Sequence, residues 1–168
     1  MLSDKMLSAL NEQIKEELFS EYLYLSMSAW CDANDLPGMA SFLKLKSEEE
    51  RAHAMKFYNY ILDRDGKITL LAIDKPQSEF NSFLDIFENQ LKHEQKITGT
   101  IHKLYALSVE EKDYATQVML QWFIEEQVEE EKEAKDIIQQ CKKIGDNESA
   151  LFLLDDRLGS QAPNTEEN

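Results

Sequence analysis

The sequence predicts an all-α protein: a four-helix bundle with one long crossover and a short fifth helix at the C-terminus. Its long segments carry apolar residues at helical spacing, and the five glycines and three prolines among 168 residues leave those segments largely uninterrupted. Two long segments joined by a tight turn are followed by a long connection and then by a second such pair. This order is typical of a bundle with a single crossover.

The first two predicted helices form a hairpin. Ser3 or Asp4 can cap a helix that runs to about Asp32. The sequence NDLPG at 34–38 breaks this helix, and Pro37 suits the first turn of the next one. The second helix is expected to end near Gly66.

The predicted crossover covers residues 66 to about 78. Its apolar part, residues 68–73, could be read as a strand, but an isolated strand has nothing to pair with. We therefore expect an extended link that packs along the bundle.

The second helix pair is expected at about 82–107 and from 113 to about 144. Ser108 could cap the later helix through a capping box with the glutamates that follow it, and Asp113 could cap it equally well. A short apolar helix follows at 148–158 and needs a docking surface, since it is too short to be stable alone. We expect one domain, residues 1–158, and a disordered acidic tail at 159–168.

Composition excludes several classes of function. The formal net charge of −15, from 33 acidic and 18 basic residues, argues against nucleic-acid binding, which needs clustered lysine and arginine. No apolar run resembles a signal peptide or a membrane span. Cys31 and Cys141 form no paired motif and are expected as core residues in a reducing compartment. The sequence therefore predicts a cytoplasmic protein.

Polar residues interrupt the apolar stripe of the second predicted helix. Glu50 and His53 are three residues apart and so point to the same side of a helix. Leu43 and Phe57 each lie seven residues from Glu50, two turns away on that side. A buried carboxylate without a partner is costly, so this pair requires compensation from elsewhere in the fold.

Similar interruptions occur in the middle of the other three long helices, at Glu17, Glu94, Gln127 and Glu130. Each of these residues alone is more often a surface ion pair or a satisfied polar contact than a metal ligand. Their coincidence on four helices favours a metal cluster. A glutamate from each of two helices and a Glu-x-x-His motif form most of the di-iron carboxylate pattern of four-helix bundles.

From Met1 to about Leu158 the chain resembles the non-haem bacterial ferritins. The similarity rests on spaced elements, namely Glu17, Tyr24, ERAH at 50–53, KHE at 92–94 and QVEE at 127–130. It implies oxidation of Fe(II) by dioxygen or peroxide at a di-iron centre within each subunit. It also implies storage of ferric mineral inside a homo-oligomeric shell of twenty-four subunits, with the fifth helix pointing inward at four-fold axes.

The resemblance also assigns roles to residues. The first iron position matches Glu17, Glu50 and His53; Glu50 bridges to a second position that matches Glu94 and Glu130; Gln127 and Tyr24 lie beside the site; and a third, looser position matches Glu49, Glu126, Glu129 and Glu130. The alternative for the third position is an acidic surface without a defined site. His93 and His102 are expected on the surface.

Two departures argue against haem. Gln127 and Glu130 stand where bacterioferritins carry a second Glu-x-x-His, and Arg51 stands where they carry the haem-ligating methionine. Two other readings remain open, a helical bundle that only buffers divalent cations and a DNA-coating mini-ferritin. The acidic terminus and the fifth helix disfavour the second of these.

Overall fold

Five α-helices follow one another in the computed structural model, which describes residues 1–161. They are α1 (Asp4–Ala33), α2 (Pro37–Asp63), α3 (Phe83–Glu110), α4 (Tyr114–Ile144) and α5 (Glu148–Gly159). The described residues contain no strand, which confirms the predicted all-α class. None of the described helices is long and apolar enough to cross a lipid bilayer.

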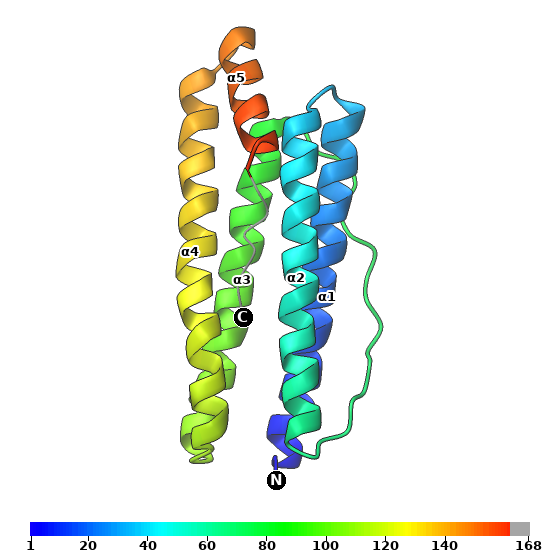
Figure 1. Ribbon diagram of the computed structural model, residues 1–168, viewed down its shortest axis with the longest axis vertical. Coiled ribbons are helices and arrows are strands. Elements are labelled where there is room, and N and C mark those ends of the chain that lie inside the picture. The colour runs from blue at the N-terminus through cyan, green and yellow to red at the C-terminus, as the bar shows by residue number, and fades with distance from the viewer. Residues whose placement is uncertain (162–168) are drawn as a thin grey trace.

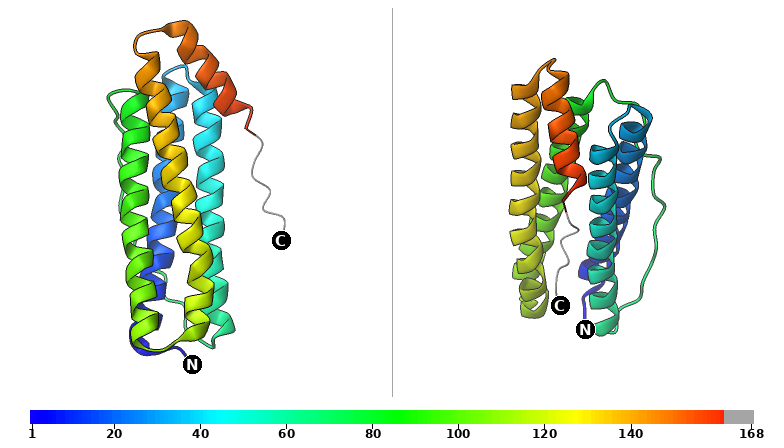
Figure 2. Two further views of the ribbon diagram at one scale, coloured as in Figure 1. Left: turned by 90° about the vertical axis from the view of Figure 1, so that its left-hand side faces the viewer. Right: turned by 45° about the horizontal axis from the view of Figure 1, so that its top comes forward.

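The four long helices lie side by side as two antiparallel pairs, α1 with α2 and α3 with α4 (Figure 1). Residues 64–82 run along the outside of the bundle from the end of α2 to the opposite end, where α3 begins (Figures 1 and 2). This is the single long crossover that the sequence predicted.

Side chains of α1 hold the crossover in place. The Asn11 amide donates to the backbone oxygen of Lys67 at 3.1 Å and accepts from the Thr69 amide at 2.8 Å, while the Ser26 hydroxyl donates to the Gln77 oxygen at 2.8 Å. These bonds satisfy backbone groups that a strand partner would otherwise satisfy. The apolar segment 68–73 is accordingly an extended link, as expected.

Polar side chains cap three of the long helices. Ser3 Oγ accepts from the Met6 amide at 2.9 Å at the start of α1, and Ser82 caps α3 in the same way. Asp113 caps α4 by accepting from the Thr116 amide at 3.2 Å. The alternative cap, Ser108, was wrong: α3 continues to Glu110, and the Ser108 hydroxyl bonds back to the Tyr105 carbonyl inside that helix.

The core consists of two apolar clusters separated by a polar layer. One cluster includes Met27, Phe42, Phe87 and Ile137, and the other includes Leu10, Phe57, Ile101 and Phe123. On each long helix several buried polar residues fall between these clusters. They include Glu17, Ser20, Lys46, Glu50, His53, Gln90, His93, Glu94, Gln127 and Glu130. Both cysteines are free and buried, as predicted.

Helix α5 docks on α2 and α4 and completes the start of α2. The residue that precedes α2, Leu36, offers no side-chain cap. Instead the Asp155 carboxylate accepts from the backbone amides of Gly38 and Met39 at 2.9 and 2.8 Å. The helices meet so closely that a Cβ on Gly38 would lie 1.8 Å from the Asp155 carbonyl oxygen.

The two faces of α5 differ sharply in exposure. Leu154 and Leu158 are buried against the bundle, whereas Phe152 and Leu153 are 69% and 66% exposed. Gly159 belongs to this helix and not to the predicted tail. The remainder of the tail that was expected to be disordered, residues 162–168, lies outside the described residues.

Candidate metal centre

All four long helices contribute to the polar layer at mid-bundle. The six polar residues that the sequence placed in the core there are at most 5% exposed. They are Glu17 on α1, Glu50 and His53 on α2, Glu94 on α3, and Gln127 and Glu130 on α4. The prediction from helical spacing that each of these side chains lies on an inward face is therefore confirmed.

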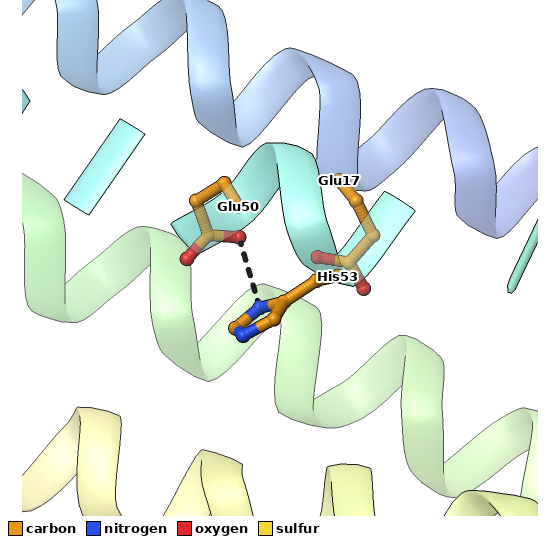
Figure 3. Close-up of side chains that lie close together, drawn as sticks. All are labelled: Glu17, Glu50 and His53. Carbon is orange, nitrogen blue, oxygen red and sulfur yellow. Dashed lines mark ion pairs between the residues drawn. The ribbon is translucent and has the colours of Figure 1, made fainter. Parts of the chain in front are cut away.

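Glu17, Glu50 and His53 converge on one point (Figure 3). A carboxylate oxygen of each glutamate and a ring nitrogen of His53 all lie within 4.8 Å of one another. His53 Nδ1 is 3.6 Å from Glu50 Oε2, because the three-residue spacing on α2 stacks the two side chains. In the part of the chain that the structure describes, no other three Asp, Glu, His or Cys side chains bring ligand atoms this close together.

The chemistry of this triad suits a first-row transition metal. Two carboxylates and an imidazole are ligands that iron accepts, and three ligands leave coordination positions open. The Gln13 amide donates to Glu17 Oε1 at 2.8 Å and so fixes that carboxylate in the core. The triad includes three of the five predicted di-iron ligands.

Glu94 lies in a hydrogen-bond network with two other predicted residues. Tyr24 donates its hydroxyl hydrogen to Glu94 Oε1. The Gln127 amide donates to Glu94 Oε2 at 3.0 Å and also to the Glu94 backbone oxygen at 3.2 Å. Glu94 is thus oriented by neutral donors from α1 and α4, and the site roles expected of Gln127 and Tyr24 stay predictions.

One oxygen of Glu130 is held by a residue that the sequence analysis did not consider. The Lys46 ammonium lies 2.6 Å from Glu130 Oε1, 2.8 Å from Glu49 Oε2 and 3.1 Å from Glu133 Oε2. Lys46 is 6% exposed. Lys46 precedes Glu50 by four residues, about one turn of helix. This spacing alone would have placed the two side chains on the same face of α2.

Burial shifts the pKa values of the carboxyl groups upward. Burial raises the pKa of Glu17 well above its usual range, and repulsion from Glu50 adds to this shift. Burial, reinforced by the Glu130 charge, raises the pKa of Glu94 to about 8. Burial likewise raises the pKa of Glu130 to about 7, although Lys46 opposes the shift.

His53 and Glu50 shift in the directions expected of an ion pair. Burial lowers the pKa of His53, but its contact with Glu50 outweighs burial and the net pKa is about 9. Burial raises the pKa of Glu50, but the His53 contact reverses that effect and the net pKa is below the usual value. The metal-free centre therefore holds protons where metal ions would supply positive charge.

His93 is a correction to the sequence analysis. It was expected on the surface, but it is buried between α1 and α3, where Nε2 lies 2.7 Å from Ser20 Oγ and the ring contacts Phe19 and Tyr24. Burial lowers its pKa to about 4, so the ring is neutral at neutral pH. The buried stripe of α3 includes Gln90 and His93 as well as Glu94, so it is broad enough to bring the His93 ring into the core. His102 is exposed, as expected.

The residues predicted for a third metal position line the edge of this centre. Glu126, Glu129 and Glu130 border a cavity of about 580 Å³, together with Lys46 and Glu133. Glu49 contacts the same cluster through its ion pair with Lys46. Arg157 of α5 and Gln161 line the same cavity.

Comparisons with known proteins agree with this architecture. The family model described as Ferritin-like domain matches residues 7–144. A bacterial non-heme ferritin of Staphylococcus aureus (strain USA300) is 39% identical over 161 residues, covering 96% of this chain and 97% of its own. One from Staphylococcus saprophyticus is 40% identical with the same coverage. The open pore ferritin of Archaeoglobus fulgidus superimposes with a TM-score of 0.95 at 41% identity, covering 96% of this chain and 100% of its own.

Proposed function

The chain belongs to the ferritin family, and from this premise we propose that it oxidises ferrous iron at the mid-bundle centre and stores the ferric product. The family and its non-haem relatives support iron storage. The observation that supports oxidation at this place is the convergence of Glu17, Glu50 and His53 in a buried layer between two apolar clusters.

We assign the substrate ions to two adjacent positions. Glu17, Glu50 and His53 hold the first ferrous ion, and Glu50 bridges to a second ion held by Glu94 and Glu130. The second position requires two changes from the metal-free arrangement. Glu94 must lose the proton that burial favours, and Glu130 must turn its Oε2 atom, which has no hydrogen-bond partner among residues 1–161, toward the metal.

Placing two ferrous ions side by side has a chemical advantage. Each ion loses one electron, and dioxygen takes both electrons and two protons to become hydrogen peroxide, so no free superoxide is released. Peroxide is itself a two-electron oxidant and can serve a second pair of ferrous ions in the same way.

The neutral residues of the centre favour release of the product. Gln127 is neutral and stands where a carboxylate or an imidazole would bind iron more strongly. The second position therefore holds a ferric ion less tightly than it would with such a ligand. Tyr24 positions Glu94 through its hydrogen bond. Glu49, Glu126 and Glu129 are proposed to form a third, weaker iron position together with Glu130 at the edge of the cavity.

We further propose that the subunits assemble into a shell of twenty-four. The outward face of α5, with Phe152 and Leu153 exposed, leaves more apolar surface than a single subunit covers. Arg51 at the position of the bacterioferritin haem ligand supports a shell without haem. The cytoplasmic location expected from the sequence stays a prediction.

Anaerobic loading with ferrous iron followed by air tests the proposed oxidation. The parent protein should consume dioxygen in proportion to the first two irons bound per subunit. Glu50→Ala and His53→Ala should remove the fast phase while leaving the helical fold intact. Glu48→Ala, which alters an exposed carboxylate on the same helix, is the matched control.

The same experiment separates a catalyst from a cation buffer. A buffering bundle binds ferrous iron but shows no coupled uptake of dioxygen in the parent. Parent-like oxidation in either the Glu50 or the His53 variant would show that the site is assigned to the wrong residues.

A further inference from the structure

A lysine side chain lies inside the acidic edge of the metal centre. The Lys46 ammonium reaches across from α2 to α4 and makes ion pairs at 2.6, 2.8 and 3.1 Å with Glu130, Glu49 and Glu133. Glu49 and Glu130 are residues that we assign to iron. One ammonium group therefore lies among carboxylates that are also proposed to bind the substrate.

The contact with Lys46 leaves one of the two carboxylate oxygens of Glu130 without a partner. The residue is 2% exposed, and only its Oε1 atom contacts Lys46. Its other oxygen, Oε2, is buried and has no hydrogen-bond partner among residues 1–161. Buried carboxylate oxygens are rarely left without a partner, so this atom indicates room for a further cation.

We propose that Lys46 is a built-in counter-cation that occupies the inner edge of the centre until a divalent metal ion displaces it. The inference rests on the proposed function, because it concerns the same Glu49 and Glu130 carboxylates. It adds two residues to the account, Lys46 as the displaced group and Glu133 as its retained partner.

The geometry explains why displacement is required. The three carboxylates are spaced around an ammonium at hydrogen-bond distances, which are longer than the bonds of a first-row metal to oxygen. A metal bound by Glu49 and Glu130 must draw these two carboxylates inward, and a positive charge left a few ångströms away would repel it. Lys46 and a third metal ion therefore exclude each other.

The lysine stem provides a path for this movement. Lysine carries its charge on a flexible four-carbon chain, and the adjacent cavity of about 580 Å³ gives the ammonium space to move. The Glu133 side chain is 35% exposed and lies at the outer side of the cluster, compared with 2% for Glu130. We expect the displaced ammonium to keep its contact with Glu133 while it releases Glu130 and Glu49.

This arrangement makes Lys46 a specificity-determining residue. A monovalent ion brings no more charge than the ammonium it would replace and has no advantage over it. A divalent ion brings twice the charge and can displace it. The lysine therefore keeps the edge of the centre closed to sodium and potassium and weakens, without abolishing, the binding of a third ferrous ion.

Metal titration of four proteins tests the proposal. Zn(II), and Fe(II) without oxygen, are titrated into the parent, Lys46→Met, Lys46→Arg and Lys142→Met by calorimetry. Methionine keeps the length of the stem without its charge, and arginine keeps the charge. Lys142 is 57% exposed and pairs with Glu88, so its variant changes net charge equally but away from the centre.

Lys46→Met should bind the third metal about tenfold or more tightly than the parent, since a unit charge is removed from within a few ångströms. Lys46→Arg and Lys142→Met should behave like the parent. Unchanged affinity for the third metal in Lys46→Met would overturn the proposal, and so would equal tightening in Lys142→Met.

A crystal structure of the parent, with and without Zn(II), tests the movement even if Lys46→Met fails to fold. With zinc at Glu130 and Glu49, the Lys46 ammonium should have left both carboxylates. Zinc bound there with the ammonium still in contact would refute displacement. This structural measurement does not depend on iron oxidation. A parent protein that binds metal ions without consuming dioxygen would refute the proposed function, but the proposal for Lys46 would still stand.

Discussion

Metal-free protein should become less stable as pH rises from about 5 to 8, and Glu94 should account for much of the change. Its pKa is about 8 in the folded protein, against 4.5 for the ordinary side chain. Above pH 4.5 the unfolded chain has released a proton that the folded chain still binds. Stability therefore falls with rising pH throughout this interval.

The magnitude follows from the same two values. One pKa unit corresponds to about 1.4 kcal/mol, so the difference between 4.5 and about 8 gives at most about 5 kcal/mol per subunit. For a chain of this length, each kcal/mol corresponds to roughly 2–4 °C in the midpoint of thermal unfolding. His53, with a pKa of about 9, acts in the same direction at higher pH, because its stabilisation is lost as pH rises through that value.

The assay is thermal unfolding of chelator-treated protein at a fixed scan rate between pH 5 and 8, in the parent and in Glu94→Gln. Glutamine is neutral at every pH and keeps the size of the protonated side chain. The difference between the two midpoints should therefore move in favour of the variant as pH rises. Parallel pH profiles would show that Glu94 does not hold a proton in the folded protein. Added Zn(II) should reduce or reverse the slope in the parent, since metal binding requires deprotonated ligands.

Three further predictions concern other parts of the molecule. Asp155→Ala removes both hydrogen bonds to the start of α2, so hydrogen exchange at the Gly38 and Met39 amides should accelerate and stability should fall by roughly 1–3 kcal/mol; unchanged exchange would contradict this role. Deleting residues 146–168 should impair or alter assembly, and elution as the same large particle with unchanged stability would count against it. Glu126→Ala combined with Glu129→Ala should leave the first two irons bound but change the ratio of iron to dioxygen in repeated additions; identical ratios would reduce these residues to a solvated acidic face.

Helical periodicity was sufficient to predict the architecture, because each long helix contributes one inward face. The same periodicity located Glu17, Glu50 and His53, since residues three or seven apart on a helix share a side. The long crossover followed from the spacing between the helix pairs. These features depend on local pattern, which a single sequence contains.

The features that were missed depend on contacts between distant parts of the chain. Lys46 is one turn from Glu50, but only the approach of α4 shows that its ammonium meets Glu130. His93 was assigned to the surface because nothing in α3 alone shows that Ser20 of α1 accompanies it in the core. Asp155 caps a helix that begins more than a hundred residues earlier, so no local signal could identify it.

The Asp155 cap also affects the order in which a subunit can be completed. This carboxylate is translated after all four bundle helices, 117 residues after the glycine whose amide it binds. While the chain is still being synthesised, the start of α2 lacks the acceptor for two of its backbone amides. The outward apolar residues of α5, Phe152 and Leu153, are translated directly before that acceptor, so they too are added after the four bundle helices. Any contact that a subunit makes through this face, including the proposed one to neighbouring subunits, therefore has to wait until α5 has been synthesised.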